Sequence, residues 1–359
     1  MQRPSGKNRG RLLCTAAALL LAAALAGVSL SPVPTGAIAA TPDETPTPTS
    51  KAGSTVVPVP HRVHTRVGPL PRGRTKIENF ETAPFPYHGV MPRSGTPFLN
   101  VLENGRRGHR TGGGHVYWED ETYSDSQVLM HLPKGFDIRR PGLLIVFFHG
   151  HGAKLAEDVY LRQKVSMQLS ESGVNAALIA PQLAVKAADS SAGKFWQPGA
   201  FGKFLAEAAQ QLGKLHGDPR AWRAFTSMPV VIVAYSGGYL TTAYCVHHGG
   251  IGNRLQGVVL FDALYGEVDI FTSWVARKKT AFFVSTYTPS TLPRNQQMQK
   301  LLAERGIPFT TELEPRLEPG SIAFLSAPRN ATHHSFLTYA WVDDPLKNLL
   351  DRLRRYARR

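Results

Sequence analysis

The sequence predicts an α/β protein with a mostly parallel central sheet and helices on both of its faces. Short apolar runs rich in Val, Ile, Leu and Phe alternate with helical patterns, which is typical of strands buried on both faces. The clearest helical pattern, over 201–215, repeats apolar residues at i, i+3, i+4 and i+7. The predicted buried strands are 143–148, 174–180, 230–235, 258–261, 281–286 and 322–325.

The first 39 residues have the pattern of a secretory signal peptide. Basic residues precede an apolar run over 12–30, and Ala37-Ile38-Ala39 offers a small-x-small cleavage site. We therefore expect an exported protein, either periplasmic or extracellular. An uncleaved membrane anchor is the alternative, because the apolar run is almost long enough to span a bilayer.

The next segment, 40–75, is rich in Thr and Pro and lacks apolar periodicity. This composition predicts a disordered linker. We expect a single α/β domain over 76–359, because the alternation of strands and helices continues to the end of the chain. Its first part, 76–113, is rich in Pro, Gly and Arg, so we expect an irregular N-terminal extension there.

The sequence also predicts two strands before the parallel ones and a helix after them. Residues 115–118 and 127–132 have strand composition and are expected to be neighbouring antiparallel strands at its leading edge. The last helix is expected to start at Pro345, with Asp344 as its N-cap.

The chain is strongly basic, with 41 Lys and Arg against 26 Asp and Glu and a formal net charge of +15. Removal of 1–39 takes away four basic and no acidic residues, which leaves 37 against 26 and a net charge of +11. Such a surface suits anionic cell-envelope polymers or lipid headgroups. The positive charges are dispersed, so no nucleic acid partner is expected. Cys245 is then the one remaining cysteine, which excludes an intramolecular disulfide, and the oligomeric state is left open.

A serine ends the most regular apolar run. The run 230–235 leads directly into Ser236-Gly237-Gly238, and a helical pattern follows. A strand, a sharp turn carrying a serine and a helix make up the nucleophile elbow of serine hydrolases, which lifts the hydroxyl above the sheet. Ser236 is therefore the candidate nucleophile.

A serine hydroxyl becomes nucleophilic when a histidine takes its proton and a carboxylate orients that histidine. Functional groups gather at the carboxyl ends of parallel strands. Asp262 directly follows the strand 258–261, and no carboxylate follows the next strand before Glu304, so Asp262 is the candidate acid. Two histidines, His333 and His334, follow the last strand; His333 is favoured as the base because it follows the short Thr332, but His334 stays open.

The loop after the strand 143–148 reads His149-Gly150-His151-Gly152. An oxyanion hole needs the backbone N–H after the nucleophile and a second N–H from such a loop. The amides of Gly237 and His151 are therefore the candidate donors. His149 and His151 alone are an incomplete ligand set, so no metal is expected.

Ser191 is a rival nucleophile, since it also has a glycine two residues later. No apolar strand precedes it, so we interpret 189–196 as a loop over the site that can line a substrate pocket. Asp189 would be an alternative acid if this loop folded back towards Ser236.

The order Ser236, Asp262, His333 or His334 resembles that of the α/β-hydrolase superfamily, over roughly 115–359. Two features depart from its usual pattern. Ala234 replaces the first glycine of the elbow, and the acid follows the strand directly after the elbow strand rather than the one after that. The resemblance implies the α/β-hydrolase fold and an esterase-like or lipase-like serine hydrolase.

The sequence thus predicts an exported serine hydrolase that cleaves an ester, or an amide, through an acyl-enzyme and without a cofactor. Two alternatives stay open. One is a non-catalytic envelope-binding protein that keeps the hydrolase fold, and the other is an amidase or peptidase that acts on cell-wall peptides.

Overall fold

The computed structural model describes residues 68–358. The predicted signal peptide and residues 40–67 of the predicted linker lie outside the described residues. Within 68–358, no helix has the length and apolar character needed to cross a membrane.

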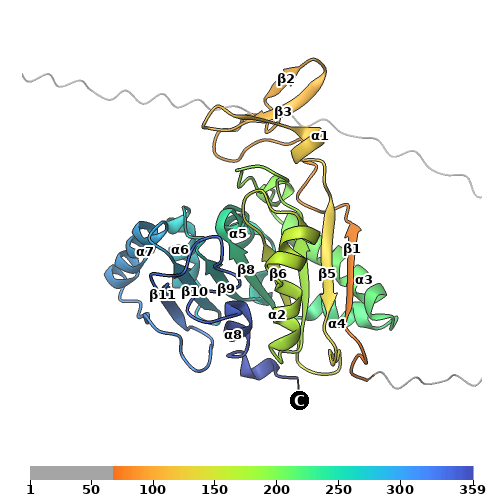
Figure 1. Cartoon of the computed structure of the whole chain (residues 1–359), viewed down its shortest axis with the longest axis vertical. Coiled ribbons are helices and arrows are strands. Elements are labelled where there is room, and N and C mark those ends of the chain that lie inside the picture. The colour runs from red at the N-terminus through yellow and green to blue at the C-terminus, as the bar shows by residue number, and fades with distance from the viewer. Residues whose placement is uncertain (1–67, 359) are drawn as a thin grey trace, which may run out of the picture. The chain divides into compact units, whose positions relative to one another are not determined.

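An eight-stranded sheet forms the centre of the fold (Figure 1). Strand β5 runs opposite to the other seven strands, because its pairings with β1 and β7 are antiparallel and the pairings from β7 to β11 are parallel. In spatial order the strands are β1 (Arg74–Asn79), β5 (Gln127–Leu132), β7 (Ala176–Pro181), β6 (Leu143–Phe148), β8 (Val230–Tyr235), β9 (Leu255–Phe261), β10 (Phe282–Tyr287) and β11 (Ile322–Ser326). The predicted mostly parallel α/β architecture is confirmed.

Helices cover both faces of this sheet, and the strands supply apolar side chains to both. Along β8, Val230, Ile232 and Ala234 belong to one apolar core, whereas Val231, Val233 and Tyr235 belong to the other. This alternation follows from the two-residue period of a strand. Helices of the first core are α3 (Ala200–His216), α4 (Ala221–Ser227), α5 (Tyr239–His248), α6 (Val268–Arg277) and α7 (Leu292–Glu304). The second core holds a π-helix (Leu155–Arg162), α2 (Val165–Glu171) and α8 (Pro345–Leu350).

The order of the strands marks one place on the sheet for a site. The chain passes from β6 to β7 on one side and then to β8 on the other side of β6. Connections that leave neighbouring strands in opposite directions open a crevice at their carboxyl ends, where ligands bind in open α/β sheets. Ser236 and the loop after Phe148 lie at this point.

The prediction for the leading edge of the sheet is wrong in one respect. The antiparallel partner of β5 is β1, whereas β4 (Val116–Trp118) belongs to a separate sheet with β2 (Val101–Glu103) and β3 (Arg106–Arg110). The short helix α1 (Glu119–Thr122) follows β4 directly and turns the chain away from β5. Strand β1 escaped prediction because it is a largely exposed edge strand without apolar alternation.

The N-terminal extension is therefore more regular than expected. Strand β1 begins at Arg74, two residues inside the segment assigned to the linker, and Leu70 is already buried against the domain. The backbone amide of Leu70 donates to the carbonyl oxygen of Phe136 at 2.9 Å. The small sheet and α1 lie together beyond the carboxyl ends of the parallel strands (Figure 1).

Gln168 of α2 connects this helix to the segment that carries His333. Its fully buried amide donates to the carbonyl oxygen of Leu337 at 2.7 Å. Its oxygen accepts hydrogen bonds from the amides of Leu346 at 3.0 Å and Lys347 at 3.3 Å. These amides start α8 and have no acceptor within the helix, so one side chain joins the segment between β11 and α8, at Leu337, to the start of α8.

Replacement of Gln168 by leucine is expected to lower the free energy of unfolding by about 2–4 kcal/mol, because each buried polar group left unpaired costs about 1–3 kcal/mol. Urea unfolding followed by circular dichroism measures this change. Gln296→Leu, at an exposed position of α7, is the control and should change the value by less than about 0.5 kcal/mol. Equal effects of the two substitutions would contradict the assigned role of Gln168.

Candidate active site

Ser236 stands on a strained turn between β8 and α5. Its φ angle is 53°, in the left-handed region that non-glycine residues rarely adopt. The backbone at Gly150 and Gly238 packs closely around this turn. A Cβ on Gly150 would lie 2.8 Å from the Cβ of Ser236, and a Cβ on Gly238 would lie 2.4 Å from the carbonyl oxygen of Phe148. The two glycines therefore let the turn approach the end of β6.

His333 bridges the serine and the aspartate. Its Nε2 lies 2.8 Å from Ser236 Oγ, and its Nδ1 lies 2.6 Å from Asp262 Oδ2. Since a carboxylate can only accept, Nδ1 carries the proton and donates it, which leaves Nε2 free to accept from the serine hydroxyl. The ring stacks on Tyr235, with centroids 5.1 Å apart, and the Tyr235 hydroxyl donates to the backbone carbonyl of His333 at 2.6 Å.

Asp262 is fully buried and is held as an anion by hydrogen bonds. The Thr288 amide donates at 2.9 Å, and the hydroxyls of Thr288 and Thr291 donate at 2.8 and 2.5 Å. Burial alone would raise the pKa of this carboxyl, but the hydrogen bonds from His333, Thr288 and Thr291 outweigh it and bring the pKa below its usual range. Asp262 is therefore charged when it faces the imidazole.

The structure separates the two candidate histidines. The His334 side chain is exposed, and no hydrogen bond joins it to another residue in the described part of the chain. The structure brings His333 to Ser236 and Asp262, and it leaves His334 outside this group.

Gly237 lies in the turn just before α5, and His151 lies in the loop after β6. Gly237 is the second residue of the 3₁₀ turn Ser236–Gly238, so its N–H has no acceptor within the helix. Within residues 68–358, no acceptor is found for the His151 amide either. Gly237 also lies directly beneath the His151 ring, because a Cβ at 237 would meet His151 Cδ2 at 2.3 Å.

The strand order places the crevice between β6 and β8, and the crevice holds a strained serine that is hydrogen-bonded to a histidine and a buried aspartate. The mostly parallel sheet with helices on both faces is the architecture that the α/β-hydrolase resemblance implied. The chain has the α/β-hydrolase fold.

Searches against family models and against curated proteins found no match. Among solved structures, the chain is similar to the feruloyl esterase module from Clostridium thermocellum, with 14% identity over 78% of this chain and 95% of that one, at a TM-score of 0.42. It is also similar to an S-formylglutathione hydrolase from Agrobacterium tumefaciens, with 11% identity over 70% of this chain and 98% of that one, at a TM-score of 0.41. A third similar structure is Thermogutta terrifontis esterase 2, with 10% identity over 64% of this chain and 86% of that one, at a TM-score of 0.36. At these identities, the substrates and activities of these proteins are not assigned to this chain.

His149 anchors the oxyanion loop and does not point towards a ligand. Its Nδ1 donates to the carbonyl oxygen of Gly150 at 2.8 Å, and its Nε2 accepts from the Leu183 amide and from Gln182 Nε2, each at 2.9 Å. His151 turns the other way, towards Ser190. Across residues 68–358, no three His, Cys, Asp or Glu side chains gather as metal ligands.

The rival residues on the 189–196 loop have other partners. Asp189 accepts hydrogen bonds from the Ser191 hydroxyl at 3.0 Å and from the Tyr123 hydroxyl at 2.9 Å. Phe195 and Trp196, which were expected to line a substrate pocket, are buried in the first apolar core. The apolar character of these two side chains in the sequence did not distinguish a pocket wall from the core.

Sequence reasoning missed the residues that hold the aspartate and the histidine in place. The segment 287–291 after β10 is rich in hydroxyl groups and lacks a carboxylate, and its Thr288 and Thr291 bind Asp262. Tyr235 looked like a strand residue, and nothing in the sequence joins it to His333.

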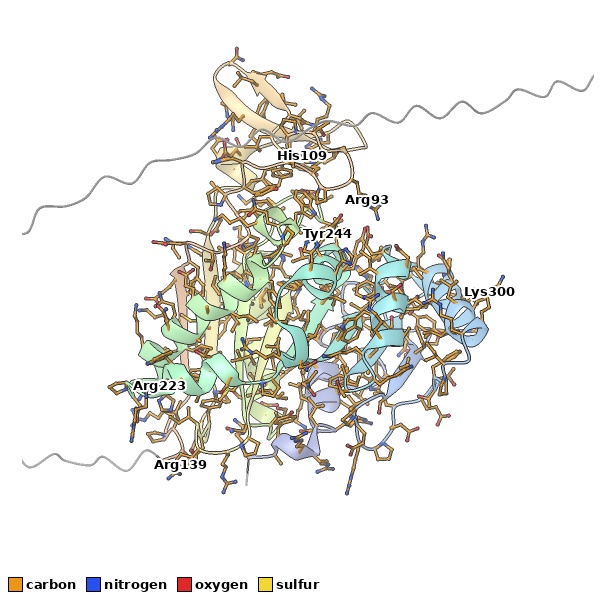
Figure 2. All side chains as sticks on the ribbon, turned by 180° about the vertical axis from the view of Figure 1, so that it is seen from behind. Arg93, His109, Arg139, Arg223, Tyr244 and Lys300 are labelled. Carbon is orange, nitrogen blue, oxygen red and sulfur yellow. The ribbon has the colours of Figure 1, made fainter. Side chains whose placement is uncertain are left out.

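The extension is tied to the loop after Asp262 by an ion pair. Nη2 of Arg93 donates to both carboxylate oxygens of Glu267 at 2.6 Å, and the Glu267 side chain is 6% exposed. Figure 2 shows Arg93 beside Tyr244 of α5, and the neighbouring Glu267 raises the pKa of Arg93 above its usual value.

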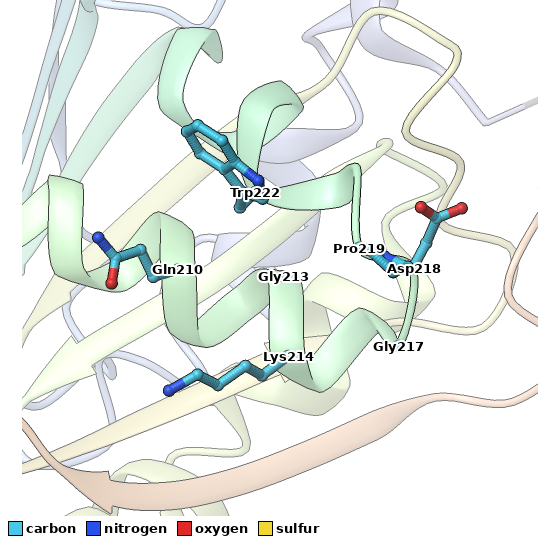
Figure 3. Close-up of a pocket in the computed structure, with 7 residues that line it drawn as sticks. All are labelled: Gln210, Gly213, Lys214, Gly217, Asp218, Pro219 and Trp222. Atoms are coloured by element: carbon cyan, nitrogen blue, oxygen red, sulfur yellow. The ribbon is translucent and has the colours of Figure 1, made fainter. Parts of the chain in front are cut away.

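A groove of about 610 Å³ lies elsewhere on the molecule, between α3 and α4. Figure 3 shows its lining, which includes Lys214, Asp218 and Trp222. None of Ser236, Asp262 and His333 contributes to its wall. We therefore do not connect this groove with the Ser236 site.

The His149 interactions predict a loss of stability in acid. Burial lowers the pKa of His149 to about 4, from about 6.5 in the unfolded chain, so the unfolded state binds more protons between these pH values. The contribution of neutral His149 to the free energy of unfolding is therefore complete above about pH 6.5. It falls by about 3 kcal/mol as the pH drops to about 4. Urea unfolding at a series of pH values measures this slope.

His149→Gln is the test variant, because a glutamine oxygen can still accept from the loop amides but does not titrate. The free energy of unfolding of His149→Gln should therefore lack the fall between about pH 6.5 and pH 4 that His149 causes. His131, whose pKa burial also lowers to about 4, remains in both proteins and gives the same background slope. An unchanged slope in His149→Gln would contradict the assignment.

Proposed function

We propose that this protein is a serine hydrolase that cleaves a carboxylic ester through the triad Ser236, His333 and Asp262. The observation that carries the proposal is the pair of hydrogen bonds made by one imidazole, to Ser236 Oγ at 2.8 Å and to Asp262 Oδ2 at 2.6 Å. A histidine held in this way has the tautomer that a general base needs.

In the proposed reaction, Ser236 Oγ attacks the ester carbonyl carbon while His333 Nε2 takes the hydroxyl proton. The carbonyl oxygen becomes an oxyanion, and the amides of Gly237 and His151 donate to it. Asp262 stabilises the imidazolium. Collapse of the intermediate breaks the bond to the leaving alkoxide, which takes the proton from His333 and leaves as the alcohol.

The acyl-enzyme is then hydrolysed by the reverse sequence. His333 takes a proton from water, the resulting hydroxide attacks the acyl carbon, and Ser236 Oγ leaves with the proton returned by His333. The products are an acid and an alcohol, and the mechanism needs no cofactor.

Hydrolysis of esters of graded acyl length, compared with peptide amides, tests the proposal. Ser236→Ala is expected to lower kcat by about 10⁴-fold or more, since removal of the nucleophile disables the whole triad. Ser191→Ala is the matched control, because Ser191 is also a buried serine with glycine two residues later. Full activity of Ser236→Ala on an ester that the wild type cleaves would refute the assignment, and faster cleavage of amides than of esters would favour the amidase.

A further inference from the structure

Two polar side chains converge above Gly237, the residue whose amide we place in the oxyanion hole. A Cβ at position 237 would lie 2.6 Å from His151 Nε2 and 3.0 Å from Ser190 Oγ. The space that glycine leaves open is thus bounded by an imidazole nitrogen and a hydroxyl. Neither side chain has a part in the mechanism given above.

His151 and Ser190 bind each other. Nε2 of His151 lies 2.7 Å from Ser190 Oγ. Nδ1 of His151 has no hydrogen-bond partner among residues 68–358, so the neutral ring can carry its proton on Nε2 and donate it to Ser190. The Ser190 hydroxyl then keeps its own proton for another acceptor.

The loop around Ser190 is fixed on both sides. The Gly152 amide donates to the carbonyl oxygen of Ala187 at 2.9 Å, which joins this loop to the oxyanion loop. The amide of Ala188 donates to the Tyr117 hydroxyl at 3.0 Å, and Asp189 accepts from Tyr123 at 2.9 Å. Ser190 is therefore presented from a loop with fixed neighbours, as a preorganised donor must be.

We propose that the Ser190 hydroxyl is a third donor to the oxyanion, and that the His151 side chain positions it. The proposal rests on the proposed esterase function. Ser190 contacts the reacting oxygen in the tetrahedral intermediate, whereas the His151 ring acts through Ser190. The His151 backbone amide keeps its separate place as a donor.

The test measures kcat and KM of the purified protein on an activated ester such as a p-nitrophenyl ester. Ser190→Ala is expected to lower kcat by about 100-fold, the effect of removing one oxyanion donor, with KM within about twofold of the wild type. Ser190→Thr retains a hydroxyl and should recover part of the loss. Ser191→Ala, on the same loop and bonded to Asp189, is the control and should keep kcat within about twofold.

The positioning role of His151 is tested with a pair of variants and a transition-state analogue. His151→Ala should lower kcat as Ser190→Ala does, and His151→Gln, which keeps a donor at the Nε2 position, should recover part of it. Binding of a trifluoromethyl ketone, which forms an oxyanion on Ser236, should weaken by the same factor as kcat/KM. A merely structural role would lower the folded fraction, would leave these two factors unequal and would not be rescued by His151→Gln.

The outcomes separate this proposal from the function on which it rests. If the wild type cleaves esters and Ser236→Ala does not, but folded Ser190→Ala and Ser190→Thr both keep kcat within about threefold of the wild type, the third donor is refuted and the esterase stands. If the wild type cleaves no ester, the proposed function fails and this proposal fails with it.

Discussion

The hydrogen bond from His333 Nδ1 to Asp262 is the interaction on which the rest of the site depends. It fixes the imidazole tautomer, so that the other ring nitrogen faces Ser236 as an acceptor. A buried carboxylate would by itself be costly, and Thr288 and Thr291 offset that cost by hydrogen bonding. The charge of Asp262 therefore depends on a loop that contributes no group to the proposed chemistry.

Backbone strain and close packing meet at the same point. Ser236 and Asp262 both have positive φ angles, 53° and 42°, directly after neighbouring strands. Strain of this kind persists where the surrounding structure over-determines the backbone. Here the parallel pairing of β8 with β9 sets the two turns side by side, and Tyr235 ties the histidine segment to the end of β8.

The sequence allowed prediction of the features that depend on local pattern. Apolar runs gave the parallel strands, and the abrupt change from Tyr235 to Ser236-Gly237-Gly238 gave the turn. The sequence favoured His333 over His334 without deciding between them, because adjacent residues share the same local signal and differ only in where their side chains point. Strand β1 was missed because an exposed edge strand buries too little to need apolar alternation. The contacts of Thr288, Tyr235 and Ser190 are long-range, and no spacing rule links them to the triad.

The most direct test of the account is the site of reaction with a fluorophosphonate probe, located by mass spectrometry of proteolytic peptides. An activated serine in an oxyanion hole reacts with such a probe, whereas an ordinary serine hydroxyl is a poor nucleophile. One adduct is expected, on Ser236, which disappears in Ser236→Ala and forms much more slowly in Asp262→Asn. Absence of any adduct in the folded wild-type protein, or an adduct on Ser191 that persists in Ser236→Ala, would contradict it.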